Sequence, residues 1–87
     1  MYTYTPDDFN LDNAPREMVQ YVIDHVENFH ERYNHALNKI GIMRAPLHLV
    51  DWGLFNDISE AMAEWAIYDS NLTDEEFEEL DVEEIFG

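Results

Sequence analysis

The sequence contains no cysteine, only one lysine, three glycines and three prolines. The absence of cysteine excludes a disulfide scaffold, a thiolate nucleophile and any zinc site with cysteine ligands. The shortage of glycine leaves no glycine-rich phosphate-binding loop. No apolar run approaches the roughly 18 residues of a membrane span. We therefore expect a soluble, cytoplasmic chain of 87 residues that forms a single domain.

Charge of one sign dominates the chain. The chain has twenty acidic residues and four cations, which gives a formal net charge of −16. All four cations lie within residues 1–44, whereas residues 45–87 hold thirteen acids and no cation. This charge excludes electrostatic binding to nucleic acid or to an anionic membrane, and its asymmetry indicates an interaction surface. Aromatic residues make up 14% of the chain, so it differs from a disordered acidic tail.

The spacing of apolar residues predicts an all-α fold. Between Pro15 and Gly41 these residues recur at intervals of three and four, which predicts one uninterrupted helix over residues 15–40, with Gly41 as its stop. On one edge of this helix a row that contains two cations is expected either to contact the acidic half of the chain or to face solvent as a basic fringe. The row contains Met18, His25, Arg32 and Lys39.

The remaining segments complete a small three-helix domain over residues 1–87. Residues 1–14 form an irregular arm, attached by Phe9, Leu11 and either Tyr2 or Tyr4. Residues 46–69 form a second helix, which Gly53 could kink or break. Residues 73–86 form a short, broken acidic helix, because two capping boxes follow one another. Thr73 is predicted to cap Glu76, and Asp81 to cap Glu84.

Metal and catalytic sites are not expected. His25, His30 and His35 are five residues apart, so on a helix they point in different directions. Glu27 and His30 form a single E-x-x-H step, whereas helical di-iron sites need two. Residues 69–80 resemble an EF-hand loop, but they lack its glycine and its final glutamate. Without a nucleophile motif, we expect neither metal, cofactor nor enzymatic activity.

The carboxylates carry the strongest functional signal. Acids four residues apart in the tail repel one another at a cost of about 0.2–0.5 kcal/mol per pair, and no lysine relieves them. A net charge of roughly 2 to 8 in magnitude is enough for the solubility of a small domain. Glutamates one helical turn apart imitate the phosphates of DNA, which carries one charge per roughly 3.4 Å of each strand. The expected partner-binding residues are Asp57, Glu60, Glu64, Glu75, Glu78, Glu79 and Glu83.

These features predict a non-enzymatic inhibitor that presents a DNA-like surface to a protein with a basic nucleic-acid-binding groove. Such a partner would be a nuclease, a restriction or CRISPR effector, or a nucleoid protein. In size and charge alone, the chain resembles the small acidic anti-restriction and anti-CRISPR proteins of phages. The alternative is an acidic helical adaptor or assembly module that binds a partner, or itself as a homodimer, through apolar contacts, with the charge serving only solubility. A solvated acidic face without a partner, as in proteins adapted to high salt, is also open, although such adaptation would spread the acids over the whole surface. The apolar C-terminal residues Ile85 and Phe86 are expected to dock onto the two long helices, and they are also candidate anchors for contacts with a partner.

Overall fold

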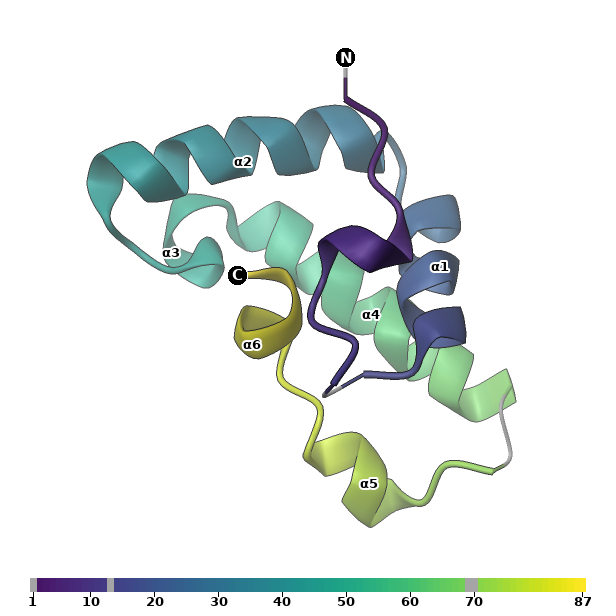
Figure 1. The fold of residues 1–87 in the computed structure, drawn as a ribbon. Helices are drawn as coiled ribbons and strands as arrows, with labels where there is room; N and C mark the ends of the chain where they lie inside the picture. The colour runs from purple at the N-terminus through teal and green to yellow at the C-terminus, as the bar shows by residue number, and fades with distance from the viewer. Residues whose placement is uncertain (1, 13, 69–70) are drawn as a thin grey trace.

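The computed structural model describes residues 2–12, 14–68 and 71–87, and within these ranges every regular element is a helix (Figure 1). The predicted all-α fold is therefore confirmed. After a short 3-10 turn η1 (Pro6–Asp8) come α1 (Arg16–His25), α2 (Phe29–Met43), α3 (Leu47–Val50), α4 (Trp52–Tyr68), α5 (Asp74–Glu78) and α6 (Val82–Phe86). Residues 69 and 70, where we placed the end of the second helix and the start of the EF-hand-like segment, lie outside the described ranges.

The prediction of one helix over residues 15–40 is wrong, because α1 and α2 are separate. The chain turns at Asn28, which adopts the left-handed conformation with φ 56°. Asparagine tolerates this region better than most residues. The apolar spacing did not reveal the turn because Val26 and Phe29, on either side of it, are both buried in the same core.

The end of this segment also differs from the prediction. Helix α2 runs through Gly41 and stops only at Arg44, which is left-handed with φ 51°. The row of residues expected on one edge is not continuous either, because Met18 is fully buried. Lys39 remains on the exposed surface of α2.

The second predicted helix is divided at Asp51. Its carboxylate oxygen Oδ1 accepts a hydrogen bond from the Leu54 backbone N–H at 3.1 Å, which satisfies a donor in the first turn of α4. Gly53 lies within the first turn of α4, so the break occurs two residues before it. Helix α4 therefore begins directly after Asp51, because the side chain of this aspartate caps its first turn.

The N-terminal arm attaches to the core through Tyr4, and the exposed Tyr2 plays no part in the core. The Tyr4 backbone N–H donates to His30 Nδ1 at 2.9 Å, and its phenol donates to Asn34 Oδ1 at 3.2 Å. As predicted, Phe9 and Leu11 also pack against the core. His30, the histidine of the E-x-x-H step, therefore binds the backbone of the N-terminal arm.

The C-terminal segment forms two short capped helices, as predicted. Thr73 Oγ1 accepts a hydrogen bond from the Glu76 N–H at 3.1 Å. Asp81 caps α6 one residue earlier than predicted, since it accepts from the Glu83 N–H at 3.0 Å. The Ile85 and Phe86 side chains are buried among the core residues, so in this fold they are not exposed anchors.

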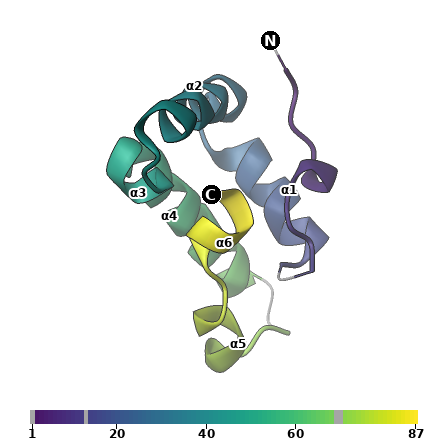
Figure 2. The same cartoon turned by 60° about the vertical axis from the view of Figure 1, so that its left-hand side comes forward.

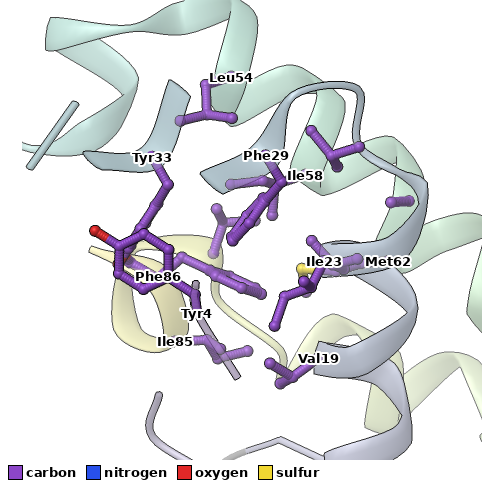
Figure 3. Packing of buried hydrophobic residues seen from close by; sticks show 14 of the residues in the cluster. Tyr4, Val19, Ile23, Phe29, Tyr33, Leu54, Ile58, Met62, Ile85 and Phe86 are labelled. Carbon is purple, nitrogen blue, oxygen red and sulfur yellow. The ribbon is translucent and has the colours of Figure 1, made fainter. Parts of the chain in front are cut away.

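The core lies between α1, α2, α4 and the last helix, whose Val82, Ile85 and Phe86 are buried in it. Contacts join α6 to α3 and to α4, and two views of the ribbon show α6 near these helices (Figures 1 and 2). Phe29, Tyr33 and Phe86 meet in this core (Figure 3). Burial, together with Tyr4 and Asp8, raises the pKa of the Tyr33 phenol, which donates a hydrogen bond to the Phe86 carbonyl. Helix α6 is therefore part of the hydrophobic core.

Candidate protein-binding surface

The seven predicted acids occupy three separate places in the fold. Asp57, Glu60 and Glu64 lie on α4, whereas Glu75 and Glu78 lie on α5, with Glu79 at its end. Glu83 lies on α6. The acids of α4 and α5 are therefore two patches, which we call the α4 patch and the α5 patch.

The α4 patch borders a surface hollow of about 240 Å³. Glu60 and Glu64 are exposed, and their helix packs against α1. Burial and the neighbouring Glu64 carboxylate raise the pKa of the Tyr21 phenol on α1. The hollow is also lined by His25 and Glu27. The sequence did not indicate that Glu27 lies next to the α4 patch, because it is the turn between α1 and α2 that brings this residue beside α4.

Asp57 is not free within the α4 patch. Its Oδ2 lies 2.9 Å from Arg32 Nη2, and both side chains are partly exposed, at 44% and 29%. The same guanidinium donates to the Glu27 carbonyl at 3.1 Å. Each of the two predictions for the basic row therefore holds for one of its cations, since Arg32 contacts an acid of the second half and Lys39 faces solvent. Because the pair of Arg32 and Asp57 links α2 to α4, spacing along one helix could not reveal it.

The α5 patch is more exposed than the α4 patch. The side chains of Glu75, Glu78 and Glu79 all face solvent. Glu79 also lines a groove of about 380 Å³ between the arm and the C-terminal segment, together with Glu76 and Asp12. Leu11, Leu72 and Leu80 supply apolar lining to the same groove. The fold therefore brings an arm carboxylate next to the C-terminal acids.

The Glu83 carboxylate is hydrogen-bonded within the molecule. Its carboxylate accepts hydrogen bonds from the backbone N–H groups of Leu47 at 3.0 Å and His48 at 2.9 Å, and it lies 2.8 Å from His48 Nδ1. Burial opposes its ionisation, but the hydrogen bonds from His48 and Leu47 outweigh this effect and lower the pKa of the carboxyl. Only 26% of the side chain is exposed. Glu83 thus joins α6 to the start of α3.

The described part of the chain contains no group of three or more histidine and acidic residues that could hold a metal ion. His30, which would be needed for the E-x-x-H arrangement, binds the backbone of Tyr4 instead. Within the same residues, no helix combines the length and the apolar character needed to cross a bilayer.

Few of the acids that the structure describes form an ion pair with a cation. Among the described residues, the ion pairs are Arg16 with Asp7, Arg32 with Asp57, and His48 with Glu83. Repulsion among the remaining acids opposes the compact state, and dissolved ions screen it.

We therefore expect added salt to stabilise the fold. The melting temperature should rise between low and moderate ionic strength, by roughly 4–8 °C for each kcal/mol of repulsion relieved. Circular dichroism melts in sodium chloride measure this, with a neutral osmolyte at the same concentration as a control. A melting temperature that falls with salt would show that attractive pairs outweigh the repulsion and that the free negative surface is small.

Comparison of the chain with protein-family models, with curated proteins and with solved structures finds no match.

Proposed function

We propose that this protein is a non-enzymatic inhibitor that presents DNA-like negative charge to a protein with a basic nucleic-acid-binding groove. The observation that supports this most is the exposure of the α4 and α5 patches in a chain of net charge −16, which has ion pairs to only three acids among its described residues. Such a field attracts a basic groove from a distance and accelerates the encounter.

The spacing of the acids also favours this function. Glu60 and Glu64 are four residues apart on α4, which is roughly 6 Å along the axis. DNA carries one charge per roughly 3.4 Å of each strand, so charge from a neighbouring element is needed to match it. Glu27 supplies such charge next to α4, because the turn after α1 places it on the same hollow.

The contacts within the fold reduce the proposed binding set. Asp57 is neutralised by Arg32, and Glu83 is occupied by the start of α3. The proposed set is therefore made of exposed acids only, which are Glu27, Glu60, Glu64, Glu75, Glu78 and Glu79.

The experiment starts with capture from a bacterial lysate at low and at high salt, followed by identification of the retained protein. Its affinity is then measured for two double variants, Glu60→Gln with Glu64→Gln and Glu78→Gln with Glu79→Gln. Each should weaken binding by roughly 1–2 kcal/mol, about five- to thirtyfold, and flatten the dependence on salt, because each removes charge–charge contacts. The intact chain should also displace DNA or RNA from the partner.

A matched control separates local contacts from net charge. Asp24→Asn with Glu31→Gln removes the same two charges, from α1 and from the first turn of α2, and both positions are exposed. This control should retain nearly full affinity. If all three double variants bind equally well, or if the captured partner has no nucleic-acid-binding groove, the chain is not a mimic of DNA.

A further inference from the structure

One end of the molecule contrasts with the acidic remainder. Residues 32–50 contain no acidic residue, although the chain has twenty, and they form most of α2 and all of α3. Three of the four cations are located there. Arg32 is paired with Asp57, whereas Lys39 and Arg44 form no ion pair with any residue that the structure describes. This end therefore carries free positive charge.

Apolar side chains are exposed at the same end. They belong to the last turn of α2, to α3 and to the first residue of α4, and contacts join α3 to both longer helices. Their exposed fractions are large for apolar residues, and Trp52 is supported from one side by a stacked Phe55. We call this surface the basic apolar end; its residues are Lys39, Ile42, Met43, Arg44, Leu49 and Trp52.

A second exposed apolar surface lies at the opposite end of α4. Ile67 and Tyr68 are 79% and 75% exposed. Trp52 and Tyr68 are the first and last residues of the helix, so about 24 Å separates the two surfaces along its axis. Figure 1 shows α4 running from α3 toward the side of the molecule where α5 lies. Glu64 lies one turn before Tyr68. We call Glu64, Ile67 and Tyr68 the acidic apolar end.

We propose that a second copy of this chain docks head to tail, with the basic apolar end of one copy against the acidic apolar end of the next. Charge decides the direction. A symmetric contact between two basic apolar ends would bring Lys39 and Arg44 of both copies into one interface that offers them no acid. The head-to-tail contact instead joins those cations to an acid, while apolar residues on both sides leave water.

This arrangement leaves one basic and one acidic end unoccupied in every dimer. A heterologous contact of this kind continues until a ring closes or a filament grows. We therefore expect the mass in solution to rise with concentration beyond that of two chains, as measured by light scattering or analytical ultracentrifugation on the full chain.

Two substitutions, each at an exposed position, block the two ends separately. Ile42→Asp disables the basic apolar end, and Ile67→Asp disables the acidic apolar end. Each variant alone should remain at the mass of one chain, 10.3 kDa. An equal mixture should form dimers and nothing larger, because the intact basic end of one variant meets the intact acidic end of the other. The control Thr3→Asp adds the same charge at an exposed arm position and should assemble as the unmodified chain does.

Three results would overturn the inference, and melting curves first establish that each variant is folded. The unmodified chain could stay at the mass of one chain up to millimolar concentration. Ile67→Asp could still form dimers while Ile42→Asp does not, which would indicate a symmetric contact. The mixture of the two variants could fail to pair. None of these results depends on the proposed inhibitor function, because no nucleic-acid-binding partner is present.

Discussion

Replacing Phe86 by alanine should cost about 3–5 kcal/mol of folding free energy, as large aromatic truncations in a packed core do. Its side chain is only 1% exposed. Its ring centroid lies 4.9 Å from that of Phe9 and 6.3 Å from that of Phe29, and its carbonyl accepts a hydrogen bond from Tyr33. Native domains are stable by only about 5–15 kcal/mol, so this loss takes most or all of the stability of so small a fold.

Urea denaturation followed by circular dichroism measures the change, with Tyr68→Ala as the control. Tyr68 is also a large aromatic residue, but 75% of it is exposed, so its truncation should change the stability by less than about 0.5 kcal/mol. The samples must be dilute, so that self-association does not contribute. If Phe86→Ala were as stable as the unmodified chain, α6 would not belong to the core, and Phe86 would again be a candidate anchor for a partner.

The helical fold could be predicted from the sequence because apolar spacing reports which side chains are buried. Val22, Val26, Phe29 and Tyr33 follow the spacing of three and four, and all are buried. The same spacing could not reveal the turns at Asn28 and Asp51. Each turn is decided by one residue, through tolerance of a left-handed conformation or through a side-chain cap, while the apolar residues on both sides continue to face one core.

The candidate surface was predicted less well than the fold, because pairing between helices depends on tertiary structure. In the sequence, no cation lies within one helical turn of Asp57 or Glu83, so both appear unpaired. In the folded chain, Arg32 reaches Asp57 from α2, and the start of α3 reaches Glu83. Glu27 is the opposite case, since it joins the α4 patch only because the chain turns at Asn28. In each case the deciding contact is between residues of different helices.

Glu83→Ala should destabilise the fold by about 3 kcal/mol, since hydrogen bonds to a charged group contribute roughly 1.5–3 kcal/mol each. The substitution removes the acceptor for two backbone N–H groups at the start of α3 and separates His48 from its carboxylate. Glu78→Ala is the matched control, because it removes one glutamate charge from an exposed position of α5, another short helix of the C-terminal segment. A loss as small as that of the control would show that α6 does not depend on this contact.

The stabilising effect of Glu83 should also depend on pH in a definite direction. The hydrogen bonds from His48 and Leu47 lower the pKa of the Glu83 carboxyl in the folded chain, against the opposing effect of burial. A carboxyl whose folded pKa is lowered stabilises the protein fully above its unfolded pKa, about 4.3, and loses this effect as the pH falls through the folded value. The stability difference between the unmodified chain and Glu83→Gln should therefore be present at pH 5 and should shrink as the pH falls further, through the lowered folded pKa of Glu83. Both chains lose the mutual repulsion of their other acids as these become protonated, so taking the difference at each pH removes that effect. A difference that grew as the pH fell below about 4 would mean that the protonated form of Glu83 makes the stronger contact, contrary to the hydrogen bonds that its carboxylate accepts.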